Sequence, residues 1–456
     1  MDDFVDKRGL GALDRLEERL EGHVLRVGSD GYKTATSPRN ITARQDPLAV
    51  AAVVVAEDVA ACVSWAREVG LRVVLQATGH GAAGVVGGDC LLIDTSRLNG
   101  IEIDVERRLV RAGAGATFAA INEAAFAHGL LAPGGTAPDV ALAGYVAYGG
   151  IGWLTRPHGL ASASLEAVDF IDGFGALRRA DAEHDPNVLW AYRGGGGVGV
   201  ATRLQLKLFE ASDLWGGYLL WPASDGPAVI TAWGQALSEL HPALCTTIGI
   251  LRAPDAPTVP DALRGQPVVH LSAASIAGRE AVADLRKLLA GLPTAAIDTL
   301  GPCDSERLAT IHLDPPVPVP ALGDGRWLSS DGAAHALEIL TACGTGLDSP
   351  LSEIELRHLA CPASSVRGAL THCPGDLLLH AVGPAPTAEG SRAVQHGLER
   401  VLAAAAPVDT GHSAASFRDG QTDALDALDQ TARRRLGRVQ HEVDPQGLIS
   451  PARVLH

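Results

Sequence analysis

The sequence predicts an α+β protein with two domains, and three observations support this prediction. The chain has 456 residues, which is more than one hydrophobic core usually fills. Short apolar runs alternate with amphipathic segments up to about residue 210, and a second series of such segments comes after it. Hydrophobic residues make up 46% and charged residues 20%, a balance typical of globular proteins and not of disordered ones.

Charge, hydropathy and cysteine usage exclude several classes. The formal charge of 37 − 53 = −16 argues against a nucleic-acid surface. The longest aliphatic run, Leu48 to Ala56, is too short to span a membrane, and the acidic start shows no secretory signal. Seven scattered cysteines without a C-x-x-C pair predict reduced thiols in a cytoplasmic protein, with neither a disulfide framework nor a metal site.

The first region begins with a helix over 10–21, where leucines recur at helical spacing. The apolar, β-branched run 48–56 predicts a strand, and 57–69 predicts a helix because it opens with acids and stops at Gly70. By the same criteria strands are expected over 72–76, 91–94, 100–105, 109–114 and 166–173, with a helix over 116–128.

The second region predicts one sheet covered on one side by helices. Strands are expected over 215–221, 268–273 and 351–359, and helices over 226–240, 278–290 and 333–343. Two proline-rich stretches, 254–260 and 315–320, predict loops.

The glycine run 194–199 (GGGGVG) fits a dinucleotide-binding pattern only by its letters. A Rossmann site needs a strand before the glycines and a helix after them. Here a helix (185–192) comes first and a strand (200–209) comes second, so we reject an NAD site. Two interpretations of the glycine run remain open: a tight connection between the helix and the strand, or a loop that faces a cofactor. The sequence contains no G-x-S-x-G and no H-E-x-x-H motif, so it does not indicate a hydrolase.

Two other glycine loops are more informative. The loop Thr78-Gly79-His80-Gly81 comes after the strand at 72–76 and lets the backbone approach a ligand. A second turn, 133–136 (PGGT), precedes a glycine-dense stretch over 142–154. Together they suggest a large, phosphate-bearing cofactor bound in extended form.

Six ordered blocks carry a family resemblance: Gly79-His80, Cys90–Asp104, Arg111–Thr136, Gly149–Leu160, Asp185–Gly197 and Asp444–Pro451. In these blocks the chain resembles the FAD-linked oxidases of the vanillyl-alcohol-oxidase and berberine-bridge-enzyme (PCMH) type, which include bacterial 6-hydroxynicotine oxidases. The resemblance implies an N-terminal segment (1–44), a PCMH-type FAD-binding domain (45–211), an α+β substrate domain (212–408) with an antiparallel sheet covered by helices, and a C-terminal segment (409–456) that returns to the FAD domain.

The resemblance also implies the cofactor contacts. His80 would be bonded to the flavin 8α carbon, and Ala137 stands where some relatives have a second, cysteine tether, so a single covalent attachment is expected. The implied FAD-binding residues are Thr78, Gly79, His80, Gly81, Gly135, Thr136, Gly144, Gly149, Gly150, Gly152 and Val200.

The chain departs from the family pattern at four places that bear on chemistry. In the glycine loop after residue 193 only Val198 precedes Gly199, where the family usually has Asn-Phe. Gln76-Ala77-Thr78 replaces the usual Arg-Ser-Gly before Gly79. Tyr148 replaces a glycine of the glycine-rich stretch, and Ala414-Ala415-Ser416 aligns with a Tyr-x-Asn that lies at the flavin in many relatives. The tyrosine that could act as a base at 414 is therefore missing.

The strand at 351–359 supplies the catalytic candidates. Side chains alternate along a strand, so Glu353, Glu355 and Arg357 share one face. This face would look into a substrate cleft, or it would be a solvated face with an ion pair. We take Glu355 as the candidate base, Arg357 as its charge partner and Tyr148 as a third candidate; His158, His312 and Trp327 are further ones.

The resulting functional prediction is an FAD-dependent oxidase. A small alcohol, amine or secondary metabolite would lose hydride to the flavin, and O2 would reoxidise it. The alternative is a non-redox cyclase or lyase that keeps FAD as a structural element. A monomer or homodimer is expected, with no nucleic-acid or membrane partner.

Overall fold

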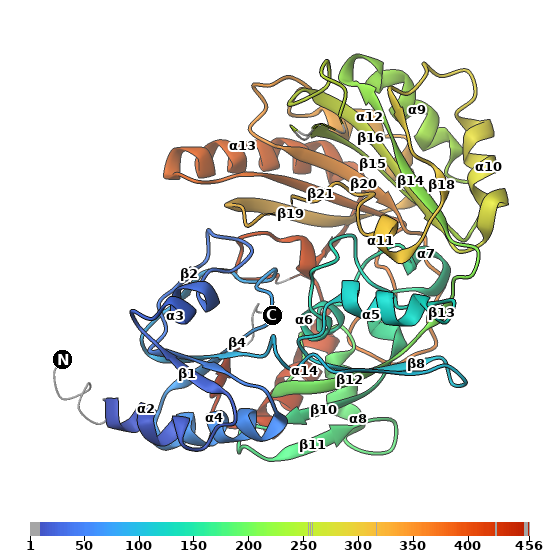
Figure 1. Cartoon of the computed structure of the whole chain (residues 1–456). Coiled ribbons are helices and arrows are strands. Elements are labelled where there is room, and N and C mark those ends of the chain that lie inside the picture. Colours follow the sequence, from blue (N-terminus) through green and yellow to red (C-terminus); the bar gives the residue numbers. More distant parts are fainter. Residues whose placement is uncertain are drawn as a thin grey trace.

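The computed structural model describes residues 10–450 and Leu455, except 254, 256, 258, 316 and 425. The chain forms a lower part that contains the first and the last described elements, α2 and β23, and an upper part built on one large sheet (Figure 1). No helix in the described ranges is long and apolar enough to cross a membrane. The start of the expected N-terminal segment and Pro451 of the last resemblance block lie outside the described residues.

The lower part contains two five-stranded sheets. The first has the order β1-β3-β6-β4-β23, with parallel pairing from β3 to β23 and an antiparallel edge at β1. The second has the antiparallel order β11-β10-β12-β8-β7. The strands of the first sheet are β1 (His23–Arg26), β3 (Ala49–Ala52), β4 (Arg72–Gln76), β6 (Cys90–Asp94) and β23 (Ile449–Ser450). Those of the second are β7 (Ile101–Asp104), β8 (Leu109–Gly113), β10 (Leu165–Ile171), β11 (Leu177–Ala180) and β12 (Val200–Lys207).

Helices cover these two sheets and separate them. They are α2 (Leu10–Glu17), α3 (Asp30–Ala35), α4 (Ala56–Val69), α5 (Phe118–Phe126), α6 (Leu142–Ala147), α7 (Thr155–His158), α8 (Pro186–Tyr192) and α14 (Gln430–Val443). Short strand pairs complete this part: β2 (Arg44–Gln45) with β5 (Val85–Val86), and β9 (Leu130–Leu131) with β13 (Phe209–Glu210). The order α8, glycine loop, β12 agrees with the rejection of a Rossmann site.

The upper part is a nine-stranded antiparallel sheet in the order β17-β14-β16-β15-β20-β21-β19-β22, with β18 paired to β14. The strands are β14 (Trp215–Pro222), β15 (Leu244–Arg252), β16 (Pro267–Ser275), β17 (Ile297–Asp298), β18 (Gly301–Pro302), β19 (Ala321–Leu328), β20 (Glu353–His358), β21 (Leu377–Pro384) and β22 (Asp409–Ser413). The helices are α9 (Gly226–Ala236), α10 (Gly278–Leu288), α11 (Ser305–Leu308), α12 (Ala336–Thr341) and α13 (Ala388–Ala405).

The expected return of the C-terminal segment needs a correction at its first strand. β22 pairs with β19 and so remains in the upper sheet. Two later elements lie with the lower part: α14 packs on α8, and β23 extends the first sheet beside β4. The segment therefore joins both parts instead of leaving the upper one at residue 409.

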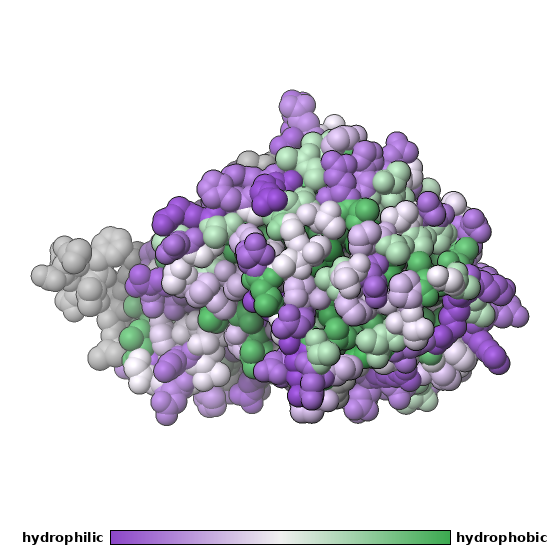
Figure 2. Space-filling view, turned by 90° about the horizontal axis from the view of Figure 1, so that it is seen from above, coloured by the Kyte–Doolittle hydropathy of each residue, from purple (hydrophilic) through white to green (hydrophobic). Residues whose placement is uncertain are grey.

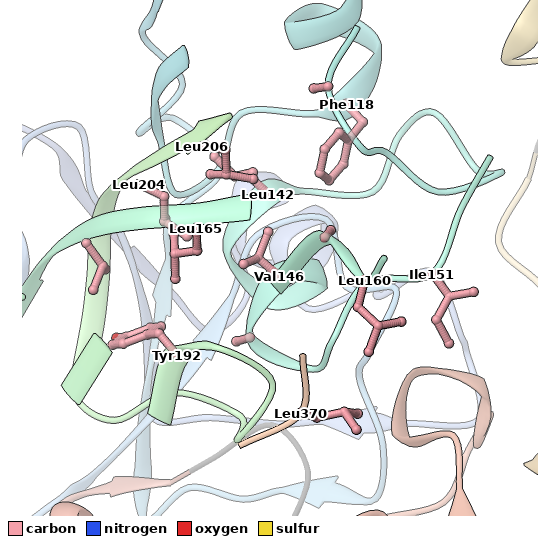
Figure 3. Close-up of a cluster of buried hydrophobic side chains, with 14 of the residues drawn as sticks. Phe118, Leu142, Val146, Ile151, Leu160, Leu165, Tyr192, Leu204, Leu206 and Leu370 are labelled. Carbon is pink, nitrogen blue, oxygen red and sulfur yellow. The ribbon is translucent and has the colours of Figure 1, made fainter. Parts of the chain in front are cut away.

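The two faces of the upper sheet have different roles. One face packs an apolar core against α9, α10, α12 and α13, with Ile248, Leu271, Ile354 and Leu356 buried in it. The opposite face turns toward the lower part, and the two share one apolar cluster that includes Phe118, Leu142, Trp327 and Leu378. Figure 3 shows a portion of this cluster around α6 and Leu160, with Leu370 reaching it from the upper part.

The surface seen from above carries hydrophilic residues over most of its area, and hydrophobic residues show between them in small groups (Figure 2). Most of this face is the outer side of the upper part. The chemistry-bearing residues lie on the other side of the sheet, toward the lower part.

Candidate active site

The alternation predicted for β20 is present. Register places Glu355 between Gly249 of β15 and His380 of β21, and His270 of β16 lies beyond Gly249 in the same row across the sheet. Since Ile354 and Leu356 face the helices, Glu355 and Arg357 face the lower part of the molecule. The interpretation of this face as solvated is wrong, because Glu355 is only 1% and Arg357 only 4% exposed.

Glu355 is the centre of a buried cluster of charged groups. Its Oε1 accepts a hydrogen bond from Arg357 Nε at 2.8 Å, and Arg357 Nη2 lies 2.6 Å from the same oxygen. Its Oε2 lies 2.9 Å from His312 Nε2, and His380 Nδ1 is 3.4 Å from Oε1. Two outer carboxylates complete the set: Asp314 contacts His312 at 3.2 Å, and Asp419 contacts His380 at 2.9 Å.

Mutual charge decides the protonation of this cluster. Burial alone would raise the pKa of Glu355, but Arg357 and His312 outweigh burial and hold it well below its ordinary value. Burial would lower the pKa of His312, but Asp314 and Glu355 raise it to about 10. For His380, burial is likewise outweighed, by Asp419 and Glu355, and its pKa is also about 10. At neutral pH Glu355 is thus a carboxylate flanked by three cations.

Glu353 differs from Glu355 although it lies on the same face. Burial and the charge of Glu355 raise the pKa of Glu353 to about 7. His312, Glu353 and Glu355 each offer an atom within 4.8 Å of the others, which is a spacing that a metal ion could use. Arg357 already neutralises Glu355 at 2.6 Å, so the cluster does not need a cation, and we assign no metal to it.

The C-terminal segment contributes a residue that the sequence did not indicate. Phe417 packs under the guanidinium of Arg357, with 4.7 Å between Arg357 Cζ and the ring centroid, and meets His380 edge-on at 5.1 Å. Ala414, which stands where many relatives have tyrosine, is buried in the shared apolar cluster. An aromatic ring three residues further along therefore reaches the charged cluster, but it carries no hydroxyl group.

The other catalytic candidates lie in different places. Trp327 is fully buried in the shared apolar cluster. Tyr148 lies beside the glycine loop after α8, where a Cβ added to Gly196 would be 3.4 Å from its ring, and not in the row of Glu355. His158 stacks on Phe209 with ring centroids 3.8 Å apart. Of the candidates outside β20, His312 is the one that the structure brings to Glu355.

The glycine-dense stretch faces this cluster through two aromatic residues. Tyr145 of α6 is wrapped by Gly135, Gly150 and Gly152, and a Cβ at Gly150 (φ +71°) would come within 2.6 Å of the Tyr145 ring. Trp153, at the end of this stretch, lies 6.4 Å from His312, centroid to centroid. Close packing on Tyr145 therefore explains why these positions need glycine.

Buried polar atoms without a partner lie on both sides of the contact between the two parts. Three of them are Tyr145 Oη, Trp153 Nε1 and Ser272 Oγ. Buried polar atoms are normally hydrogen-bonded, so these three fit a polar ligand between the Gly149–Trp153 stretch and the sheet. In addition, no atom lies within 4 Å of where a Cβ would stand at Gly81 or Gly144. The residues present thus fit an extended, polar cofactor.

At two of the implied cofactor contacts, the structure shows that the side chain is engaged with other parts of the protein. The side chain of Val200 is buried in the apolar cluster of the first sheet, so only its backbone could meet a cofactor. Thr78 uses its hydroxyl to accept a hydrogen bond from the backbone N–H of Ala141 at 3.3 Å, which joins the two glycine loops.

Comparison with known proteins agrees with this geometry. The FAD binding domain family matches residues 47–181. The (R)-6-hydroxynicotine oxidase of Paenarthrobacter nicotinovorans is 25% identical over 346 residues, covering 73% of this chain and 72% of that protein.

Residues 47–181 match an FAD-binding domain, and the chain is similar to an FAD-linked oxidase over 73% of its length.

Two further relatives are of note. The xylooligosaccharide oxidase of Thermothelomyces thermophilus is 29% identical, over 50% of this chain and 47% of that protein. The crystal structure of 6-hydroxy-D-nicotine oxidase from Arthrobacter nicotinovorans has the same fold, with a TM-score of 0.79, 22% identity, and coverage of 94% of this chain and 96% of that one. The predicted PCMH-type bipartite fold and the family resemblance are confirmed.

The cysteines need a correction. Cys361 and Cys373 form a disulfide across a loop of the upper part, whereas all seven were expected to be reduced. The five other cysteines are free thiols. Sequence spacing could not reveal the pair, because its two members are brought together by the loop between β20 and β21.

Proposed function

We propose that this FAD-dependent oxidoreductase is an oxidase that takes a hydride from a C–H bond beside an oxygen or nitrogen of a small alcohol, amine or secondary metabolite. FAD would supply the hydride acceptor and would pass the electrons to O2. The observation that carries the proposal is the buried cluster around Glu355, which lies across from the glycine-dense stretch of the FAD-binding domain. The relatives' names specify a hydroxynicotine and oligosaccharides, so they do not select one substrate for this chain.

The chain's own residues would hold the cofactor from both sides. The loop with His80 and the turn with Gly135 and Thr136 belong to the FAD-binding domain, and we propose a single covalent attachment through His80. Ser272 offers a buried polar atom from the sheet above. Exclusion of water by the shared apolar cluster strengthens every charge interaction in this space.

Proton removal from a substrate hydroxyl or ammonium would fall to the carboxylates of β20. Glu355 is ionised at neutral pH, but its lowered pKa makes it a weak base. Glu353, whose pKa is about 7, is matched to working pH and lies on the same face of the strand. We therefore propose that Glu355 orients the substrate and accepts its proton, and that Glu353 is the second site to which this proton can move.

Anaerobic mixing with candidate alcohols and amines tests the redox assignment. Bleaching of the flavin band, with H2O2 formed once air is admitted, is the expected result. Turnover of a substrate without bleaching would indicate the cyclase or lyase alternative, which the oxidase names of the relatives do not favour.

Location and assembly are proposals as well. We propose a monomer or homodimer in the cytoplasm. Reducing compartments seldom retain disulfides, so a cytoplasmic location predicts that Cys361 and Cys373 are reduced in the cell. The redox state of this pair in freshly purified protein tests the location.

A further inference from the structure

Three separate segments meet at His80. Its Nε2 lies 2.9 Å from Oδ1 of Asp139, which is 59 residues further along the chain. Oδ2 of Asp139 lies 3.5 Å from Nη1 of Arg39. Arg39 is anchored in turn, because it donates to the carbonyl of Pro315 in the upper part. The histidine is thus held by a carboxylate that is itself held by a guanidinium.

The backbone around His80 is fixed as well. Gly79 adopts φ +76°, and a Cβ there would come within 2.9 Å of Pro38, next to Arg39. The loop with His80 therefore packs tightly on the segment that supplies Arg39. The hydrogen bond with His80 also lowers the pKa of Asp139, so this carboxylate is ionised and can only accept.

The carboxylate determines which ring nitrogen of His80 can react. A neutral imidazole has one N–H and one lone pair, and the hydrogen bond of one nitrogen decides which it carries. With Nε2–H donating to Asp139, the lone pair of the neutral ring is on Nδ1. We propose that Asp139 is a positioning residue for covalent flavin attachment, which fixes His80 so that Nδ1 forms the bond to the 8α carbon. This inference rests on the proposed attachment through His80.

The step balances with O2 as the oxidant. The bond that forms joins Nδ1 to the 8α carbon, and the bond that breaks is one C–H of that methyl group, whose proton leaves. The electron pair of this C–H bond enters the ring system, which passes two electrons to O2. The alkylated imidazole is a cation until it gives up its Nε2 proton, and Asp139 stabilises this charge and can take the proton. The two protons and two electrons complete H2O2.

The test measures attachment and not turnover. Wild type, His80→Asn, Asp139→Ala and Asp139→Asn proteins are incubated with FAD, and covalent flavin is measured over time by fluorescence of denatured protein on a gel. Noncovalent FAD is measured separately in the native protein. Asp139→Ala should attach flavin about tenfold or more slowly, as expected when a partner that orients a histidine is removed. Asp139→Asn should be less impaired, since its amide oxygen can still accept the Nε2–H.

Formate provides the decisive readout. If Asp139 acts by holding the imidazole, added formate should speed attachment in Asp139→Ala and leave wild type unchanged. Asp89→Asn is the matched control: it removes a carboxylate paired at 2.8 Å with Arg72 on β4 of the same domain, and it should attach flavin at the wild-type rate.

Two results would overturn the role of Asp139 and leave the proposed function intact. One is attachment by Asp139→Ala at the wild-type rate. The other is joint loss of covalent and noncovalent FAD in both Asp139 variants without rescue by formate, which would make Asp139 merely structural. Acid-soluble flavin in the wild type itself would instead refute covalent attachment, and the inference with it.

Discussion

At the scale of single residues, the environment of each carboxylate decides its role more than its place on the strand. Glu353 and Glu355 are two positions apart on one face of β20. Glu355 meets Arg357, His312 and His380, so its pKa is depressed, whereas the pKa of Glu353 rises to about 7. Sequence alternation predicted that they share a face but could not predict this difference, because the histidines come from β21 and from the segment before β19.

Replacing Glu355 by glutamine should slow anaerobic flavin reduction about 10²-fold or more, in the range expected for loss of a general base. The change keeps the shape of the side chain and removes its charge. Stopped-flow absorbance under argon measures it. Glu353→Gln should have a smaller effect and should abolish a pH dependence of the reduction rate near pH 7.

An unchanged reduction rate in Glu355→Gln would contradict its role as proton acceptor. A larger loss in Glu353→Gln than in Glu355→Gln would exchange the two assignments. Because removal of a buried charge also leaves Arg357 unbalanced, bound flavin and the unfolding transition of each variant are measured first.

Stability should pass through a maximum near pH 6.5. The pKa values of His312 and His380 are raised to about 10, so the stabilisation that they give is complete below the ordinary value of 6.5 and is lost as pH rises toward 10. Burial lowers the pKa values of His270 and His358 to about 3, so the unfolded chain binds more protons between pH 3 and 6.5, and stability falls as pH falls through this window. Denaturant unfolding over this pH range measures both limbs.

His380→Gln should flatten the alkaline limb, because one of its two titrating groups is gone. The exposed His396, whose partner Glu399 is one helical turn away, is the matched control, and His396→Gln should leave both limbs as in wild type. An alkaline limb of wild-type slope in His380→Gln would show that the contact with Asp419 does not stabilise the fold.

At the scale of elements, the sequence predicted the helices and strands whose apolar residues recur at a clear spacing. The helix over 57–69 and the strand over 72–76 match α4 and β4 almost residue for residue. Strands β15, β19 and β21 were not predicted. β19 contains Gly323 and Gly325, which have low strand propensity; Gly325 is needed because Phe417 packs against it. Tertiary packing overrides the local signal at such positions.

A chain that ends after Leu428 should lose FAD and most of its stability. It would retain β22, Phe417 and Asp419 but would lack α14 and β23. The buried side chains of Leu436, Val439 and Val443 would be removed. At roughly 1.5–3 kcal/mol each they contribute roughly 4.5–9 kcal/mol together, which is comparable to the total stability of many domains. Calorimetry and flavin content measure the outcome.

Arg435→Ala is the control for this truncation. It removes only a cation–π contact with Trp190 and a hydrogen bond to Asn187, and it should cost about 1 kcal/mol while FAD is retained. A truncated protein that stays yellow and cooperative would show that the lower part does not need the returning segment.

At the scale of the whole molecule, the two parts form one packed unit. Arg156 of α7 is the clearest link: its guanidinium, 8% exposed as a residue, donates to the carbonyls of Leu240, His241 and Leu244 in the upper part. The sequence predicted two domains from length and pattern, and the family resemblance indicated the cofactor. Neither could show this link, since Arg156 and its acceptors are far apart in the sequence and local pattern carries no signal between them.

Arg156→Ala should therefore destabilise the contact between the parts, by about 3 kcal/mol or more, because buried carbonyls lose their donor. Two unfolding transitions in place of one, or earlier release of FAD on heating, are the expected signs. Arg193 of the lower part offers a comparison, because it donates to the carbonyl of Leu165 in the same part and to the carbonyl of Arg367 in the upper part. Arg193→Ala should also destabilise the contact between the two parts. A single transition at the wild-type midpoint would show that apolar packing alone joins the parts.

The alternation along β20 has a consequence for how this protein can vary. A one-residue deletion or insertion within the strand would exchange its two faces, so that Glu355 and Arg357 would point into the helix-covered core and Ile354 and Leu356 toward the lower part. Such a change would remove the chemistry and the core together. Variation in length must therefore fall outside the strand, and the loop after it, which the Cys361–Cys373 bond closes, can change in length without a change of register.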